Sequence, residues 1–339
     1  MTADLTSRQK TLLKGIVQRY IQTANPVGSD DLISLCRLDC SPATVRNEMA
    51  ALEEMDYLHQ PHPSAGRVPT DKGYRFYVDG PMKKIPVTVE EEEGIQDIMR
   101  RARGNAAMVF AESSLILGKI SQELGIVLTP QLSLAVFDRL ELIGLSERKM
   151  LVVIHVQSRL VRTVVLQLDA DWKDRDLETT TVILNERLSG LTLDEIRRHI
   201  HSRLGNRLTE TQGLLRFFVE KAPELFDYTG QIEAHTSGTQ HIVSQPEFVN
   251  RSLLGKLFAF IEDKSSLATM ARTIGEHPTV TIGRENQDDR LRPFSVVASN
   301  YRMGNDMGVV GILGPTRMPY HKVIPLVKRM AEAISDFLS

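Results

Sequence analysis

The chain has 339 residues, of which 42% are hydrophobic and 25% charged, and its formal net charge at pH 7 is −2. This balance is typical of a globular protein with two or three domains, and it excludes collagen-like, disordered and disulfide-scaffold chains. The chain lacks the basic excess that DNA-binding proteins often carry, so a nucleic-acid surface would have to come from the local arrangement of charges.

Cysteine usage and hydropathy indicate where the protein acts. The two cysteines, Cys36 and Cys40, indicate a reducing compartment. The polar start, residues 1–10, lacks the apolar core of a signal peptide, and no run of eighteen apolar residues occurs. We therefore expect a cytoplasmic protein that does not associate with a membrane.

The first eighty residues predict three helices followed by a hairpin. Thr6 and Gln9 have capping-box spacing, and Ser29 is placed to cap a short second helix. A third helix opens at Ser41 with Pro42 in the first helical position. Residues 59–69 contain three prolines and one glycine, which favours a β-hairpin before a closing helix over 72–78. This order predicts a winged helix-turn-helix domain over residues 1–80.

The third helix has the residue types that read base edges. If Val45, Met49 and Leu52 face inward, the opposite face carries side chains that are small or form hydrogen bonds. Arginine can bind guanine, and asparagine can bind adenine, through two parallel hydrogen bonds. The alternative interpretation is an amphipathic helix with a solvated outer face. The candidate residues for base contact are Ser41, Ala43, Thr44, Arg46 and Asn47.

The hairpin and closing helix supply candidates for phosphate contact. Basic side chains neutralise phosphates, and hydroxyl or backbone N–H groups position them. An ordinary solvated hairpin is the alternative. The candidate residues are His62, Ser64, Gly66, Arg67, Lys72 and Arg75.

The remaining chain predicts an α+β arrangement after a linker near residues 80–87. Two helices, the second over 105–124, precede three strands over 132–142, 150–156 and 160–168. The segment 172–266 is mostly helical, with a long helical pattern over 208–226. Strands over 280–282, 294–301 and 307–313 then precede a final helix over 325–338. Strands before and after a helical block predict one α+β domain with an insertion.

Other motifs favour neither a metal site nor an enzyme. Cys36 and Cys40 are separated by the predicted groove helix from His59 and His62, which are spaced too tightly for a zinc finger. The glycines between Gly308 and Gly314 lack the lysine and hydroxyl of a phosphate loop. No local signature of a catalytic triad occurs, so we expect no enzyme, no metal and no cofactor.

Two long strings, Ser41–Met49 (SPATVRNEM) and Ser64–Arg75 (SAGRVPTDKGYR), closely resemble the heat-inducible transcription repressor family HrcA. The C-terminal strings IGREN (282–286), SVV (295–297) and GILGPTRM (311–318) are similar to the same family, so the resemblance covers nearly the whole chain. Pro63 stands where the family leads us to expect threonine, and Asp56-Tyr57 stands where we expect glycine and an aliphatic residue.

The resemblance implies a repressor that binds an inverted-repeat operator upstream of chaperone operons as a homodimer. It also implies a GAF-like domain, here over 88–171 and 267–339, interrupted by an inserted dimerising domain over 172–266. Activity supported by the GroEL chaperonin is implied as well. The alternative is a metabolite-responsive winged-helix regulator that senses a small ligand through its GAF-like domain.

Overall fold

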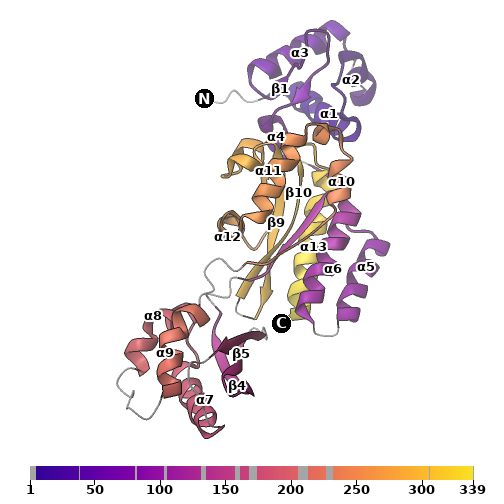
Figure 1. The fold of residues 1–339 in the computed structure, drawn as a ribbon. Helices are drawn as coiled ribbons and strands as arrows, with labels where there is room; N and C mark the ends of the chain where they lie inside the picture. The colour runs from indigo at the N-terminus through magenta and orange to yellow at the C-terminus, as the bar shows by residue number, and fades with distance from the viewer. Residues whose placement is uncertain are drawn as a thin grey trace.

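The computed structural model describes residues 5–37, 39–80, 82–102, 105–130, 135–156, 161–167, 174–204, 213–226, 232–304 and 306–338. Figure 1 shows a helical N-terminal unit above a central sheet that is flanked by helices, and a smaller unit below them. Among the described residues, no helix is long and apolar enough to cross a membrane.

The N-terminal unit has the predicted order of three helices, a hairpin and a closing helix. Thr6 and Gln9 form the capping box, Ser41 caps the third helix, and Thr70 caps the last. The side chains of Val45, Met49 and Leu52 are buried, as predicted. The elements are α1 (Ser7–Thr23), α2 (Ser29–Cys36), α3 (Pro42–Glu54), β1 (Leu58–His59), β2 (Val68–Pro69) and α4 (Asp71–Asp79).

Asp56 connects α3 to the hairpin in a left-handed conformation with φ of 63°. This geometry explains why a glycine is expected there, since glycine adopts positive φ without a steric penalty. Aspartate is among the few other residues that tolerate this conformation. Asp56, which stands where the family resemblance leads us to expect glycine, therefore preserves the turn.

The central unit is a five-stranded antiparallel sheet in the order β7-β3-β10-β9-β8. Its strands are β3 (Leu124–Leu128), β7 (Ala234–Ser237), β8 (Thr279–Ile282), β9 (Phe294–Met303) and β10 (Asp306–Pro315). One face packs on α5 (Val89–Ala102), α6 (Ala106–Ser121) and α13 (Tyr320–Leu338). The other face packs on α11 (Arg251–Glu262) and α12 (Lys264–Thr273), which follow the short helix α10 (Thr239–Val243) and the 3₁₀ turn η3 (Pro246–Val249).

Two strands of this sheet are absent from the sequence prediction. The predicted helix over 105–124 ends at Ser121, because Gln122 turns left-handed and the following residues form β3. All five residues of β3 are buried, so it lacks the alternation that marks a strand. β7 has the sequence AHTS, which carries little hydrophobic signal.

The smaller unit joins segments that the sequence prediction assigned to different domains. β4 (Phe137–Ser146), β5 (Lys149–Val156) and β6 (Val161–Gln167) form a separate three-stranded antiparallel sheet. One face of this sheet shares a core with α7 (Asp174–Leu188), α8 (Leu193–Leu204) and α9 (Gly213–Leu225). Trp172, Leu208 and the outer ends of two predicted strands lie outside the described residues.

The predicted membership of these strands in the central sheet is therefore wrong, and so is the assignment of 232–266 to the insertion. β7 and α10–α12 pack on the central sheet instead. The physical reason is that the apolar sequence of a strand indicates that the strand is buried. It does not indicate which sheet or helices the strand packs against.

The close pairing of Gly308 with Tyr301 generates a stability prediction. The Tyr301 ring is fully buried, its hydroxyl donates to the Leu128 carbonyl at 3.0 Å, and the two residues are register partners in β10 and β9. A Cβ at position 308 would overlap this ring. We expect Gly308→Ala to lower the free energy of unfolding in urea by about 1–3 kcal/mol.

Gly255 provides the control, since it is exposed in α11 and a Cβ there would meet nothing within 4 Å. Gly255→Ala should keep or slightly raise stability, because alanine favours a helix over glycine by roughly 1 kcal/mol. Equal effects of the two substitutions would contradict the overlap with Tyr301.

Candidate nucleic-acid interface

The outer face of α3 brings together the residues predicted to contact bases. Ser41 accepts a hydrogen bond from the Thr44 backbone N–H at 3.2 Å, which caps the helix at its exposed end. Ala43, Arg46 and Asn47 are exposed, and Thr44 is half-buried. The helix therefore presents small and hydrogen-bonding side chains in the manner that a major groove accommodates.

Ser29 supports this face in a way that the sequence interpretation missed. The second helix begins at Ser29 and is capped by Gly28, so Ser29 does not cap it. Its side chain is buried, and its hydroxyl accepts a hydrogen bond from Arg46 Nε at 3.3 Å. Ser29 thus restrains the guanidinium while leaving its terminal nitrogens for a ligand.

The hairpin forms the predicted wing, and its tip is held by Gln60. The Gln60 side-chain amide donates to the carbonyls of Pro63 and Ala65 at 3.0 and 2.9 Å. His62 and Ser64 are exposed at this tip. Arg46 and the tip residues Pro63–Arg67 line one hollow of about 370 Å³, so the structure brings the helix and wing candidates together.

Gly66 is required by the close approach of the wing to the turn before α2. Val27 and Arg67 exchange two backbone hydrogen bonds of 2.9 Å. A Cβ on Gly66 would overlap the Val27 backbone. The absence of a side chain at Gly66 therefore lets the wing pair with the turn before α2. This structural role is separate from the predicted contact of Gly66 with DNA.

The three basic candidates of the wing and α4 have partners within the protein. The Arg67 side chain is only 16% exposed, and its Nε lies 2.8 Å from Glu53 Oε2. Lys72 Nζ donates to the Met55 carbonyl at 2.8 Å and lies 4.3 Å from the centre of the Tyr57 ring. These contacts give structural roles that the sequence did not reveal, and DNA contact by Arg67 and Lys72 stays a prediction.

Arg75 joins α4 to the central unit. Its guanidinium binds both carboxylate oxygens of Glu285, and it donates to the Val280 carbonyl at 2.6 Å. Asp79 is a further partner at 3.1 Å. Hydrogen bonding to Glu285 raises the pKa of Arg75, so this group keeps its charge. The structure thus directs Arg75 toward Glu285, and phosphate contact by Arg75 also stays a prediction.

The same surface of α4 makes two further contacts with the central unit. Asp71 accepts a hydrogen bond from the Arg284 backbone N–H at 2.9 Å. Gly283 has a left-handed φ of 56° and lies against the Asp71 carboxylate, where a side chain would collide. The buried rings of Tyr74 and Tyr320 lie 6.2 Å apart. Backbone, charge and ring contacts therefore all fix α4 in place.

Arg317 makes a second connection between the units. It donates to the Ile21 carbonyl near the end of α1 at 3.0 Å, and it binds both oxygens of Glu247. Gln245 accepts from Arg317 at 3.4 Å and donates to Glu123 at 2.8 Å. A polar network thus runs from α1 into the central sheet.

No group of three or more His, Cys, Asp or Glu side chains that could hold a metal is found among the residues that the structure describes. Cys36 and Cys40 are not joined by a disulfide.

Glu123 at the end of this network generates a pH prediction. It is 4% exposed, and burial raises its pKa to about 8. Because the folded state holds this proton to a higher pH than the unfolded state, its stabilising effect is present below about pH 4.5 and is lost as the pH rises to about 8. We expect Glu123→Gln to reduce this loss, by no more than about 1.4 kcal/mol per pH unit.

Urea unfolding of the wild type and the variant between pH 5 and 9 measures this difference. Glu262→Gln changes an exposed carboxylate of α11 and serves as the control. If Glu123→Gln and Glu262→Gln alter the pH profile equally, Glu123 is not the group responsible.

The fold and the exposed face of α3 define a winged-helix DNA-binding protein. A family profile described as "Winged helix-turn-helix transcription repressor, HrcA DNA-binding" matches residues 4–78, and one described as "HrcA protein C terminal domain" matches residues 107–324. The chain belongs to the HrcA family of heat-inducible transcription repressors, which are regulators and not enzymes.

Curated relatives agree with this assignment, and a solved structure shares the fold. Proteins from Prosthecochloris aestuarii and Chlorobium phaeobacteroides, both named heat-inducible transcription repressor HrcA, are 41% and 40% identical to this chain. The first alignment covers 100% of this chain and 99% of the relative, and the second covers 99% and 98%. A crystal structure titled as a hypothetical protein has a TM-score of 0.64 and 23% identity over 99% of both chains, which shows the fold alone.

Proposed function

We propose that this protein represses transcription by binding, as a homodimer, an inverted-repeat operator upstream of chaperone operons. The observation that carries this proposal is the exposed face of α3 beside the wing. Arg46 and Asn47 are exposed there, while Val45 and Met49 anchor the helix in the core. A helix anchored in this way can enter the major groove without disturbing its own domain.

We propose that the central unit is the GAF-like domain that the family resemblance implies. The antiparallel sheet with helices on both faces supports this, as does the long excursion of the chain between β3 and β7. The inserted domain then spans residues 135–226, whose described segments contribute to one hydrophobic core. This range replaces the 172–266 expected from the sequence.

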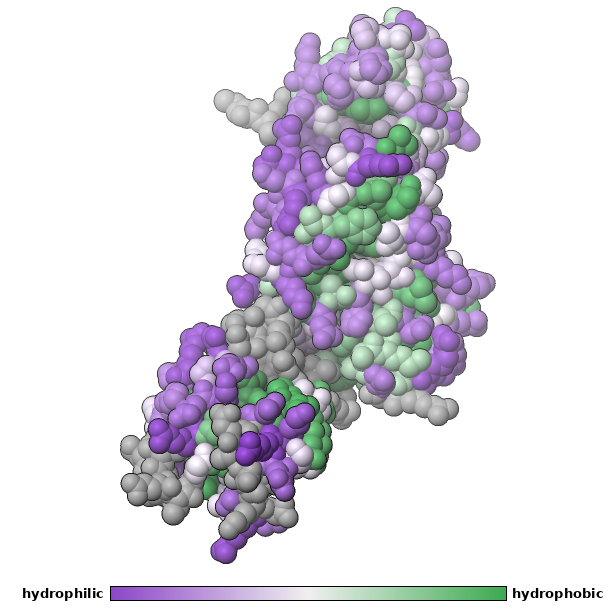
Figure 2. Space-filling view, viewed as in Figure 1, coloured by the Kyte–Doolittle hydropathy of each residue, from purple (hydrophilic) through white to green (hydrophobic). Residues whose placement is uncertain are grey.

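We place the dimer contact on the open face of the three-stranded sheet. Ile143, Leu151 and Val165 lie side by side across β4, β5 and β6. Ile143 and Val165 are 45% and 58% exposed, an unusual position for branched apolar side chains in a row. Figure 2 shows hydrophobic side chains gathered on this part of the smaller unit. Two such faces can pack together as a sheet-on-sheet interface.

The apolar side chains on the helices of the expected insertion, residues 172–266, lie mostly in the protein's own cores. Leu214 and Phe218 are buried in the smaller unit, and Leu257 is buried against the central sheet. Phe258 remains 41% exposed on α11. These positions favour the sheet face over the helices as the dimer contact.

Val165→Asp should disrupt the dimer, because a carboxylate would be buried without a partner at the interface. Light scattering should report a monomer, or a dimer weakened at least tenfold. Val182→Asp is the control, since Val182 is 55% exposed on α7. A Val165→Asp protein that dimerises as tightly as Val182→Asp would contradict this interface.

The DNA contacts can be separated by their dependence on sequence and salt. Arg46→Ala should reduce the preference for operator over scrambled DNA by about 1–3 kcal/mol, because a lost base contact affects one base pair. Lys72→Ala should weaken binding to both DNAs and lower the salt slope by roughly one unit if Lys72 meets a phosphate. Fluorescence anisotropy on both DNAs at several salt concentrations measures these effects. An unchanged specificity ratio for Arg46→Ala would overturn base reading by α3.

The role of the GroEL chaperonin rests on the family resemblance alone and stays a prediction. A cytoplasmic location follows from the proposed operator and chaperonin partners. The alternative of a ligand-sensing regulator gains support from one cavity of the central unit.

A further inference from the structure

The central unit contains a hollow of about 350 Å³ between α12, β8 and the turns η4 (Gly283–Glu285) and η5 (Asp289–Leu291), which we call the α12 cavity. This volume lies within the range of small-molecule sites. Its lining includes the apolar side chains of Phe260, Met270, Ile274, Leu291 and Val296. The cavity can therefore cover the apolar body of a small ligand.

Most polar side chains that line the α12 cavity have their hydrogens engaged within the protein, and Gln287 adds an amide that can both donate and accept. Five hydroxyl side chains line it, and each donates its hydrogen to an oxygen of the protein at 2.6–3.4 Å. The Asn286 amide nitrogen donates to three backbone carbonyls. Since a hydroxyl has one hydrogen and two lone pairs, these groups can offer a ligand acceptors but not donors. The hydroxyl residues are Ser266, Thr269, Thr273, Thr279 and Thr281.

The charged side chains that line the cavity are both acidic. Glu285 and Asp288 line it. Arg75 is shared between Glu285 and Asp79, and Arg290 is shared between Asp288 and Asp263. Both arginines lie outside the lining, which contains no lysine, arginine or histidine. A ligand that supplies N–H donors and positive charge would satisfy both the acceptors and the charge.

We propose that the α12 cavity binds a small organic amine, with its apolar body on the cavity floor and its ammonium group toward Glu285 and Asp288. Glu285 is the same carboxylate that holds Arg75 of α4. The bound ammonium competes with Arg75 for this carboxylate. Occupancy of the cavity therefore weakens the contact that holds the winged helix against the central unit.

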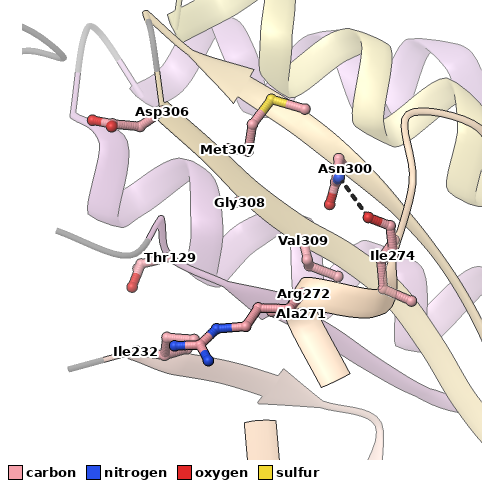
Figure 3. Close-up of a pocket in the computed structure, with 10 residues that line it drawn as sticks. All are labelled: Thr129, Ile232, Ala271, Arg272, Ile274, Asn300, Asp306, Met307, Gly308 and Val309. Carbon is pink, nitrogen blue, oxygen red and sulfur yellow. Dashed lines mark hydrogen bonds between the residues drawn. The ribbon is translucent and has the colours of Figure 1, made fainter. Parts of the chain in front are cut away.

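A second hollow, of about 290 Å³, is lined by both Arg272 and Asp306. Figure 3 shows the Arg272 side chain extending toward Ile232 and Thr129, while Asn300 donates to the Ile274 carbonyl at 2.8 Å. Because Thr129 and Ile232 lie next to segments outside the described residues, this hollow supports no ligand assignment. The α12 cavity is lined throughout by described residues.

Isothermal titration of the full-length protein with 2-phenylethylamine tests the proposal. Neutral 2-phenylethanol and anionic 3-phenylpropanoate have similar size and different charge. The amine should bind saturably and at least tenfold more tightly than either. Thr269→Phe, which fills the cavity from an exposed position of α12, should weaken amine binding at least tenfold.

Thr179→Phe is the matched control, because Thr179 is also exposed and donates to a carbonyl four residues earlier, as Thr269 does. It should leave amine binding unchanged, and circular dichroism checks that both variants are folded. Thr273→Phe fills the cavity from a second exposed position and should also weaken binding at least tenfold. No saturable amine binding, equal affinity for the three probes, or full binding by both cavity variants would overturn the site.

The coupling to α4 has its own readout. Saturating amine should speed hydrogen exchange of the α4 amides, because Arg75 loses part of its hold on Glu285. Unchanged or slower exchange with the amine bound would overturn the coupling. Neither the titration nor the hydrogen exchange uses DNA. A failure of the amine proposal is therefore distinguishable from a failure of the proposed repressor function.

Discussion

The position of α4 against the central sheet is the constraint on which the DNA-binding surface depends. Arg75 holds Glu285 and the Val280 carbonyl, and Arg317 reaches the Ile21 carbonyl from the other side. A continuous hydrophobic core runs from Leu12 in α1 to Ile334 in α13. The winged helix is therefore packed on the central unit as a partner, although residues 80–87 look like a linker in the sequence.

A short series of bonds connects α4 to the third helix and the wing. Lys72 of α4 binds the carbonyl of Met55 at the end of α3, and Glu53 of α3 binds both Arg67 and the Gln60 N–H of the wing. The third helix, the wing and α4 are thus linked by direct contacts. In a dimer joined through the smaller units, the separation of the two α3 helices would follow from how each α4 sits on its central sheet.

Local signals in the sequence predict local structure well. They predict contacts between distant segments much less well. Caps at Thr6 and Ser41 appear where their spacing predicts, because a cap satisfies groups within one turn. The contact of Arg75 with Glu285 is not predictable from local signals, because the two residues lie 210 positions apart in the sequence. The fully buried β3 was missed for a related reason, since its alternation is erased by burial on both faces. The exposed face of α3 was predictable because helical periodicity alone separates Arg46 from Val45.

The rigid position of α3 is tested most directly by changing the spacing of operator half-sites. After the inverted repeat is mapped by footprinting on chaperone-operon promoters, about five base pairs, half a helical turn, are inserted between its halves. Since α4 fixes each α3 against its own central unit, we predict at least a tenfold loss of affinity from this insertion. Affinity that is unchanged across the spacing series would contradict the account, because it would mean that the winged helices move freely on their linkers.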